Sequence, residues 1–349
     1  MQVLHEDITE IAERLKPVYP AFEGKSFLIT GGKGFLGHYL CAVLEYLNKE
    51  ALHRPAHVVL LDNGVTSRVM TDEEQTDFEF IQHDICCPLN IDREIDFIVH
   101  LAGIASPYFY RRFPLETLDV ATLGTRNVLE LARQKDAQVL YFSSSEIYGD
   151  PDANHIPIPE SYRGNVACSG PRACYDESKR LGETLCYIYS HNFAVHVNTV
   201  RPFNVYGPGM REDDFRVLPS FASAIRGNQA LTVYGQGNQT RTYTYITDAI
   251  VGFFLILAKA PPGEVYNIGN NKPELSVLDL VQVIEEVLGR TLEKHVIEYP
   301  DTYPGDEPQR RCPNIFKAKQ HLGFKPEVSI TDGISRFLSW SHQVYKGER

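Results

Sequence analysis

A glycine-rich turn near the start of the chain constrains the fold more than any other feature. The short apolar run 25–30 predicts a buried strand, and the stretch 38–49 predicts a helix. The turn between them has the spacing Gly-x-x-Gly-x-x-Gly, which lets the backbone bend sharply and approach a pyrophosphate at the helix N-terminus. A strand, a glycine turn and a helix in this order predict a dinucleotide-binding site. The residues expected to contact the dinucleotide here are Gly31, Gly34, Phe35, Leu36 and Gly37.

The end of the next predicted strand carries an acidic residue. The run 57–61 predicts this strand, and Asp62 and Asn63 follow it. A carboxylate at this position accepts hydrogen bonds from an adenosine ribose and repels a 2′-phosphate, so it favours NAD over NADP. A simpler interpretation is that Asp62 is a turn residue before Gly64. We favour the ribose role because the glycine turn precedes it.

Further apolar runs predict strands that alternate with helices. The strands are expected at 78–84, 96–103, 138–145 and 195–202, and the helices at 114–135 and 174–190. This alternation predicts an α/β fold, a Rossmann-like doubly wound parallel sheet, in which ligands bind beyond the carboxyl ends of the strands. Small residues after the fourth strand would admit a flat cofactor. Further cofactor contacts are expected from Asp84, Ile85, Leu101, Ala102 and Gly103.

The strict alternation is lost after residue 203. We therefore predict an NAD-binding domain over 1–203, with an N-terminal helical extension at about 6–15 that serves packing or a dimer edge. Residues 204–349 are predicted to form mainly a smaller α/β substrate lobe, with about 240–258 returning to the first domain. In this region the sequence predicts strands at 231–234 and 265–268 and helices at 276–288 and 330–345.

The composition narrows the class of protein. Lys and Arg number 34 against 45 for Asp and Glu, a net charge of −11, which argues against a general nucleic-acid binder. We expect neither a membrane span nor a secretory signal, because the chain has no run of about 18 apolar residues and no basic-then-apolar N-terminus. The 7 cysteines lack metal-ligand and redox spacing, which predicts free thiols, a reducing cytoplasmic compartment and no metal site.

A tyrosine and a lysine four residues apart carry the predicted chemistry. On a helix, Tyr175 and Lys179 share one face. A phenol has a pKa of about 10 and is a poor base near neutral pH, but an ammonium close by favours the phenolate and lowers that pKa. The pair suits removal of a proton from a hydroxyl while hydride leaves the same carbon. The spacing alone is common. The catalytic interpretation is supported by the hydroxyl groups at 143–145, because the fifth strand is expected to end with them at the same edge of the sheet.

Several longer motifs resemble one family. From about residue 26 to 338 the chain resembles the extended short-chain dehydrogenase/reductase family, and within it the UDP-glucuronate decarboxylases (UDP-xylose synthases). The motifs that carry this resemblance lie at 98–107, 145–151 (Ser-Glu-Ile-Tyr-Gly-Asp-Pro), 170–180, 239–241 and 308–311 (Pro-Gln-Arg-Arg). The glycine turn and the Tyr–Lys pair are common to the superfamily, whereas the Ser-Glu-Ile-Tyr-Gly-Asp-Pro and Pro-Gln-Arg-Arg motifs are much narrower.

The resemblance implies a role for each candidate site residue. Tyr175 would be the base, Lys179 would bind the nicotinamide ribose, and Ser144 would hydrogen-bond the reacting sugar oxygen. Glu146 and Arg311 would lie around the carboxyl end of the sugar. The substrate contacts that the resemblance implies are Ser145, Glu146, Arg172, Asn204, Arg241 and Arg311. Simpler interpretations remain: a solvated loop acid for Glu146, a surface ion pair for Arg311 and a turn for Asn204.

The implied reaction is a decarboxylation with NAD as the cofactor. Oxidation at carbon 4 of UDP-glucuronate makes a ketone β to the carboxylate, and a β-keto acid loses carbon dioxide readily because the electrons delocalise into the ketone. Return of the hydride then gives UDP-xylose. A 4-epimerase is the main alternative, although such relatives usually have a small or apolar residue in place of Glu146. A 4,6-dehydratase is disfavoured because Ser145 replaces the usual Asp, and a non-catalytic NAD-binding protein is disfavoured because the base and its partners are all present.

Some segments depart from the pattern of the decarboxylases. They are Arg163–Gly164, 167–172, Ala121 and 311–314. These departures leave the exact sugar and the release of the 4-keto intermediate open.

Apolar residues on two predicted helices point to a homodimer. Relatives pair the helices equivalent to 114–135 and 174–190 across a twofold axis, and cyclic dimers are the commonest oligomers. The apolar residues beyond one stripe are Leu115, Leu118, Val128, Leu129, Leu181, Leu185, Tyr187, Ile188 and Tyr189. We therefore expect a four-helix interface between two copies of the chain.

Overall fold

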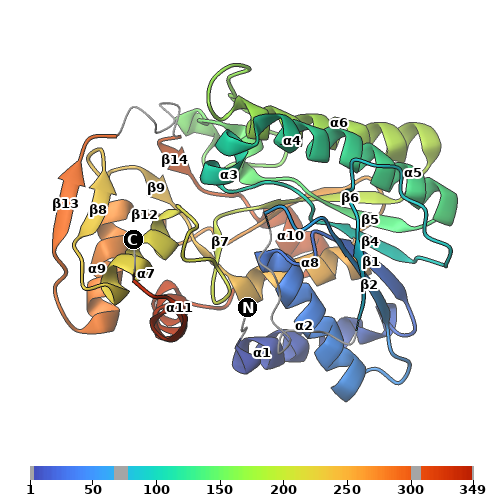
Figure 1. Ribbon diagram of the computed structural model, residues 1–349, viewed down its shortest axis with the longest axis horizontal. Helices are drawn as coiled ribbons and strands as arrows, with labels where there is room; N and C mark the ends of the chain where they lie inside the picture. Colours follow the sequence, from blue (N-terminus) through green and yellow to red (C-terminus); the bar gives the residue numbers. More distant parts are fainter. Residues whose placement is uncertain (1–3, 67–77, 300–307, 348–349) are drawn as a thin grey trace.

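Seven parallel strands form the central sheet in the part of the chain that the structure describes. This structure is a computed structural model, and it describes residues 4–66, 78–299 and 308–347. The strand order is β11-β6-β5-β4-β1-β2-β3 (Figure 1). The strands are β1 (Ser26–Thr30), β2 (His57–Asp62), β3 (Glu79–Gln82), β4 (Phe97–His100), β5 (Gln138–Phe142), β6 (Val197–Pro202) and β11 (Val265–Ile268). The order reverses between β1 and β4, so the predicted doubly wound α/β fold is confirmed, and a ligand site is expected at this reversal.

Side chains of β1 alternate between two cores, one on each face of the sheet. Phe27 and Ile29 pack in one core and Leu28 in the other. The first core includes side chains of α1 (His5–Leu15), α2 (Phe35–Glu50) and α8 (Ile246–Lys259), and the second includes those of α5 (Thr125–Lys135) and α6 (Ala173–Phe193). Helix α8 is buried along nearly its whole length because it also packs under α1, which explains why it is apolar on every side.

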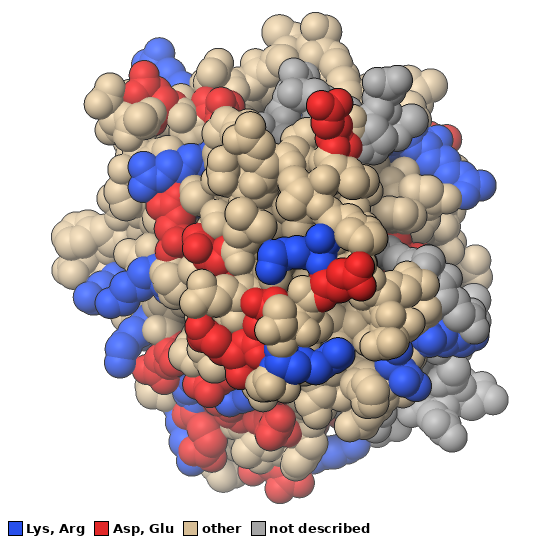
Figure 2. Space-filling view, turned by 90° about the vertical axis from the view of Figure 1, so that its left-hand side faces the viewer, with Lys and Arg blue, Asp and Glu red and all other residues tan. Residues whose placement is uncertain are grey.

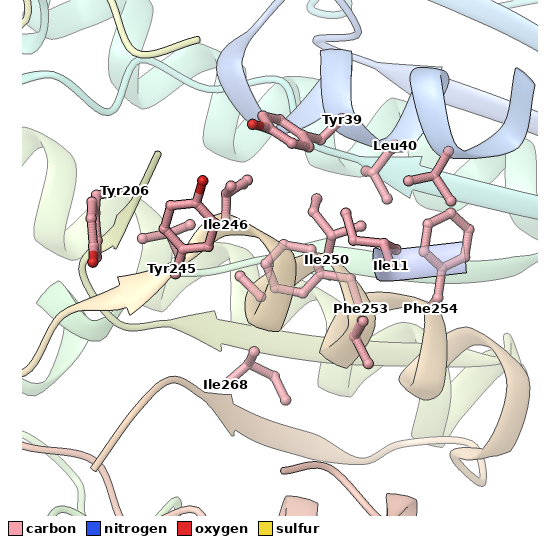
Figure 3. Close-up of a cluster of buried hydrophobic side chains, with 14 of the residues drawn as sticks. Ile11, Tyr39, Leu40, Tyr206, Tyr245, Ile246, Ile250, Phe253, Phe254 and Ile268 are labelled. Atoms are coloured by element: carbon pink, nitrogen blue, oxygen red, sulfur yellow. The ribbon is translucent and has the colours of Figure 1, made fainter. Parts of the chain in front are cut away.

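The N-terminal helix is part of the first core. Figure 3 shows Ile11 beside Ile250 and Phe254 of α8, between this helix and α2. Asp7 on the same helix is fully buried, and its carboxylate accepts hydrogen bonds from Tyr39 Oη at 2.9 Å and Tyr245 Oη at 3.0 Å. It also accepts one from Arg336 Nη1 at 3.0 Å. The extension therefore packs inside the molecule and links the beginning of the chain to its last helix.

The rest of the chain forms a second group of elements at one end of the molecule (Figure 1). Its helices are α7 (Val217–Arg226), α9 (Val277–Leu288) and α11 (Ile330–Val344). Its strands are β7 (Val205–Tyr206), β8 (Leu231–Tyr234), β9 (Thr240–Arg241), β10 (Thr244–Tyr245), β12 (Leu275–Ser276), β13 (Lys294–Ile297) and β14 (Arg310–Arg311). β8 pairs with β13, and β9 lies between β12 and β14. Figure 2 shows this end of the molecule, where acidic and basic side chains are interspersed over the surface.

The structure differs from the sequence prediction in the place of β11 and α10 and in the division of the helix predicted over 114–135. β11 pairs with β6 in the central sheet, so placing this strand in the second lobe was wrong. α10 (Phe316–Leu322) likewise packs on α8 and β11. The helix predicted over 114–135 is divided into α4 (Pro114–Asp119), a π-helical turn (Val120–Gly124) and α5. The boundary near residue 203 remains a prediction for the rest of the chain.

The remaining elements are short. They are α3 (Pro107–Arg112) and 3-10 turns at Lys16–Ala21, Ser145–Tyr148 and Ala153–His155. No described helix combines the length and apolar character that a membrane-spanning helix needs.

Candidate active site

One cavity of about 900 Å³ lies between the carboxyl ends of the sheet strands and the second group of elements. At one end it is lined by the glycine turn and at the other by β9 and the start of α9. The predicted site residues that line it are Gly31, Gly34, Phe35, Leu36, Gly37, Leu101, Gly103, Ser144, Ser145, Glu146, Arg172, Tyr175, Lys179, Asn204, Arg241 and Arg311. The cavity thus brings together most of the residues that the sequence analysis selected, from segments far apart in the chain.

The glycine turn fits a dinucleotide. A Cβ atom on Gly31, whose φ is +70°, would lie 2.8 Å from the backbone nitrogen of Ala102. A Cβ atom on Gly37 would lie 2.5 Å from the carbonyl oxygen of Gly32. Both positions therefore need glycine, because the turn packs directly against the end of β4 and against itself. Helix α2 begins immediately after Gly34, which has no side chain to cap the first turn, so backbone N–H groups face the site as a pyrophosphate requires.

The contacts of Asp62, the last residue of β2, are compatible with both roles considered for it. Asp62 Oδ2 accepts a hydrogen bond from Lys33 N at 3.2 Å, so the carboxylate lies against the glycine turn. Its other oxygen accepts one from Gly64 N at 2.8 Å, as a turn residue would. Asn63 closes the same turn by accepting a hydrogen bond from Val65 N at 3.1 Å. The ribose role of Asp62 remains a prediction.

Three other predicted cofactor residues, Asp84, Ile85 and Ala102, are not among the residues that line the cavity. Asp84 Oδ1 accepts a hydrogen bond from Cys86 N at 2.9 Å, which is the geometry of a turn. Ile85 is buried, and its Cγ2 atom would be 2.7 Å from a Cβ on Gly124. Ala102 donates its backbone N–H to Thr30 Oγ1 at 3.3 Å. Their contacts to a cofactor therefore remain predictions.

The candidate base lies on the first turn of α6. Tyr175 is buried, and its ring stacks on that of Tyr110, with 5.4 Å between the centroids and 12° between the planes. One turn later, Lys179 Nζ donates a hydrogen bond to the carbonyl oxygen of Phe142 at 2.7 Å and lies 6.0 Å from the centroid of the Tyr175 ring. The two side chains thus share a helix face, as the spacing predicted.

Burial dominates the acidity of this pair. Burial raises the pKa of Tyr175 to about 12, although a side-chain hydrogen bond with Ser144 lowers it in part. Burial also lowers the pKa of Lys179 to about 8. The expectation that the pKa of Tyr175 lies below its ordinary value was therefore wrong for the chain by itself, because desolvation outweighs the contacts with Ser144 and Arg216 that lower it.

A carboxylate held by two arginines lies farther along the cavity. Glu146 lies in the 3-10 turn Ser145–Tyr148, and its backbone N–H donates to Ser144 Oγ at 3.2 Å. Arg311 Nη2 donates to Glu146 Oε2 at 2.9 Å, and Arg311 Nη1 and Arg172 Nη2 donate to the same carboxylate. Burial alone would raise the pKa of Glu146, but the attraction of Arg311 and Arg172 outweighs it and holds this pKa at about 2. Neither a solvated acid nor a surface ion pair describes this contact, because Arg311 is 2% exposed.

Strand pairing places the second arginine motif at the site. β14 pairs in parallel with β9, so Arg311 lies beside Arg241. Arg241 Nη2 donates to the carbonyl oxygen of Pro308 at 2.7 Å and thereby supports the segment that leads into β14. Asn204 has a φ of +41° and donates its side-chain amide to Thr242 O at 2.8 Å, so it closes a turn at the cavity wall. A substrate contact of Asn204 remains a prediction.

The sequence analysis missed several side chains at the site. Tyr110 stacks on the candidate base, and Tyr108 from α3 stacks on Phe215 at the cavity wall, with 4.8 Å between the ring centroids. Arg216 lines the cavity and lowers the pKa of Tyr175. Asp176 lies 3.5 Å from Arg172. The motif at 170–180 contains Asp176, but no spacing in the sequence indicated that the other four would be here.

The comparison with family models identifies the class of protein. Residues 27–269 match the model described as the NAD dependent epimerase/dehydratase family. The match covers most of the chain, and it includes the glycine turn, Tyr175 and Lys179. The chain therefore belongs to this family.

Within the family, the chain is similar to sugar-nucleotide enzymes. It is 38% identical over 346 residues to UDP-glucuronic acid decarboxylase 1 of Danio rerio, covering 97% of this chain and 79% of that protein. It is 39% identical over 311 residues to UDP-glucuronic acid decarboxylase 3 of Arabidopsis thaliana, covering 88% and 86%. Among solved structures, UDP-glucuronic acid 4-epimerase of Bacillus cereus, in complex with UDP-glucuronic acid and NAD, is 29% identical with a TM-score of 0.77, covering 92% of this chain and 100% of that one.

Proposed function

We propose that the protein is an NAD-dependent decarboxylase that converts UDP-glucuronate to UDP-xylose. The observation that carries this proposal is the position of Glu146 between Arg172 and Arg311, in the same cavity as Tyr175. Two buried guanidinium groups provide a place for a sugar carboxylate beside a base that can start an oxidation. The similarity to UDP-glucuronic acid decarboxylases of animals and plants supports the same reaction.

The glycine turn and Lys179 would hold the cofactor. When bound, NAD accepts a hydride from the sugar and later returns it. The cavity extends from the turn past Gly103 to Lys179, whose Nζ would be only 3.2 Å from a Cβ on Gly103, so the absence of a side chain there leaves room for a flat ring. We propose that the adenosine end of the cofactor is bound by Asp62, Asn63, Asp84 and the neighbouring residues named above.

The first step requires removal of the proton from the hydroxyl at carbon 4. Tyr175 has the position for this role, with Ser144 as a hydrogen-bond partner. The pKa of about 12 means that the phenol is protonated near neutral pH in the chain by itself. A positive charge beside the ring, such as that of the oxidised cofactor, would favour the phenolate. Lys179, which is anchored to Phe142 O, keeps a cation close to the ring in its charged form.

The second step requires the carboxylate and carbon 5 to be held in place. Arg311 Nε is buried and has no hydrogen-bond partner among the described residues, so this guanidinium retains a donor. Glu146 is charged at neutral pH, and we propose that it orients both arginines around the sugar. Carbon dioxide then leaves from the β-keto acid, and Ser144 and Tyr175 are the hydroxyl groups available to stabilise the developing oxyanion.

A 4-epimerase is the second candidate. The Bacillus cereus structure binds UDP-glucuronic acid and NAD as a 4-epimerase and shares this fold, so the carboxylate site alone does not select decarboxylation. Incubation of the protein with NAD and UDP-glucuronate, followed by mass analysis of the sugar and of trapped carbon dioxide, separates the two. Loss of carbon dioxide with formation of UDP-xylose supports the decarboxylase. A product that keeps its carboxylate supports the epimerase.

We also propose that the protein works as a cytoplasmic homodimer. All seven cysteines are free thiols, which suits a reducing compartment. A dimer face on α4, α6 and the turn between α4 and α5 has five exposed apolar side chains: Leu115, Leu123, Leu181, Tyr187 and Ile188. Val128, Leu129 and Tyr189 were wrongly assigned to this face, because they are buried inside the chain.

A further inference from the structure

Four charged side chains meet at the carboxylate end of the cavity. Arg172 lies between two acids: its Nη2 donates to Glu146 Oε2, and its Nε lies 3.5 Å from Asp176 Oδ2. Arg311 contacts Glu146 from the opposite side. The side chains of the two arginines and of Asp176 are each 9% exposed or less. Charge among them is therefore poorly screened by solvent, and the balance of the group affects any ion that enters.

Asp176 is the member of this group that can change its charge. Its Oδ1 atom is buried and accepts no hydrogen bond from any described residue, which is costly for a carboxylate. Burial, together with the negative charge of Glu146, raises the pKa of Asp176 to about 7, although Arg172 and Arg311 lower it in part. Asp176 also interacts electrostatically with Cys174 and Tyr175 of α6. Asp176 therefore changes its charge near neutral pH.

We propose that Asp176 sets the net charge of the carboxylate site and so determines specificity for an acidic sugar. With Asp176 neutral, these four side chains carry one net positive charge, which adds to that of Arg241 beside Arg311. With Asp176 ionised, the four side chains sum to zero, and a substrate carboxylate meets one positive charge fewer. Asp176 lies behind Arg172 and outside the described cavity lining, so it acts through Arg172 as a positioning residue. This inference rests on the proposed function, because it takes a carboxylated sugar as the substrate.

Binding measurements on a variant that does not turn over the substrate test this proposal. We would use the Tyr175→Phe protein saturated with NAD and titrate it calorimetrically with UDP-glucuronate from pH 6.5 to pH 8.5. The dissociation constant is expected to rise by about fivefold or more over this range, the lower end of typical couplings between sites. UDP-xylose has the same diphosphate and no carboxylate, so its dissociation constant should change little. Lys179 also titrates in this range, but it would affect both ligands alike.

Two further variants assign the effect to Asp176. In the same background, Asp176→Asn should keep the low dissociation constant for UDP-glucuronate at pH 8.5. Glu177→Gln removes a carboxylate from the next residue of α6, which pairs with Arg180 at 3.6 Å, and should leave the pH dependence unchanged. Proton uptake gives a measurement that needs no Asp176 variant. At pH 8, calorimetry in buffers of different ionisation enthalpy should show uptake of roughly 0.4 proton or more with UDP-glucuronate and none with UDP-xylose.

The outcomes separate this inference from the proposed function. Three results would overturn the role of Asp176. They are an affinity for UDP-glucuronate that does not depend on pH, equal proton uptake with both ligands, and a pH dependence that remains in a folded Asp176→Asn protein. If Asp176→Asn does not fold, the inference is tested by the pH dependence of binding and the proton uptake of the Tyr175→Phe protein. The proposed function fails instead if the unmodified protein binds UDP-glucuronate but releases no carbon dioxide.

Discussion

Replacing Glu146 by Gln tests the buried charge group directly. Although burial opposes it, Arg311 and Arg172 lower the pKa of Glu146 from 4.5 to about 2. This difference corresponds to about 3 kcal/mol of preference for the charged form in the folded protein. Gln keeps the size of the side chain but not its charge, and it leaves Arg311 without its carboxylate partner. We therefore expect Glu146→Gln to lower the free energy of unfolding by about 3 kcal/mol near pH 7.

The pH dependence gives the sign of this effect. Because the pKa of Glu146 is lower in the folded protein than in the unfolded chain, its stabilisation is complete above about pH 4.5 and is lost as the pH falls toward 2. Urea denaturation measures the difference in free energy of unfolding between the unmodified protein and Glu146→Gln. This difference should fall from about 3 kcal/mol at pH 7 to about 2 kcal/mol at pH 3.5. Glu177→Gln is the matched control, since its half-exposed pair should contribute about 1 kcal/mol or less. Equal stability of Glu146→Gln and the unmodified protein at pH 7 would refute the charge balance described here.

The same variant separates oxidation from decarboxylation. If Glu146 acts at the carboxylate and carbon 5, oxidation continues in Glu146→Gln while the later steps slow. Rapid mixing with UDP-glucuronate should then show NADH absorbance that persists, together with slower release of carbon dioxide. If Glu146 only orients the substrate, both signals fall together. Undiminished turnover by both Glu146→Gln and Arg311→Ala would remove them from the site and favour the 4-epimerase.

Three other perturbations test the base, the cofactor and the assembly. Tyr175→Phe should abolish the oxidation step, so no NADH absorbance should appear even transiently; a normal transient would exclude Tyr175 as the base. Asp62→Ala should weaken NAD binding, measured by fluorescence titration, and reduce the ratio of the affinity for NAD to that for NADP. Equal affinity of the unmodified protein for both cofactors would contradict the ribose role. Sedimentation at micromolar concentration should give the mass of two chains, and a combined Leu181→Glu and Tyr187→Glu change on the dimer face should give one. A mass of one chain for the unmodified protein would count against the dimer.

Local spacing was enough to predict the features that depend on neighbours in the sequence. The glycine turn after β1 and the shared face of Tyr175 and Lys179 are of this kind, and the structure has both. The grouping of Glu146 with Arg311 came from the resemblance instead, because the two residues are 165 positions apart. No local pattern contains the pairing of β14 with β9 that brings them together.

Burial explains most of what the sequence did not predict. The pKa of Tyr175 was expected to fall because Lys179 is near, but desolvation has the larger effect, and its extent depends on how Tyr110 and the sheet enclose the ring. The strand β11 was recognised from its apolar residues, yet its partner β6 lies far back in the chain, so its assignment to the second lobe was wrong. Val128 was assigned to a dimer face for a similar reason, since a helical pattern does not show which apolar side faces the sheet.

The contact between Asp7 and Arg336 has a consequence for synthesis of the protein. The two residues are 329 positions apart, and at about 5–20 residues per second the ribosome needs roughly twenty seconds to a minute to make the chain between them. Tyr245, the other distant partner of Asp7, also arrives late. During that time the N-terminal helix has its acid but not the cation that neutralises it, so burying α1 would leave an unpaired charge. We therefore expect α1 to dock stably only after α11 has been made and can supply Arg336.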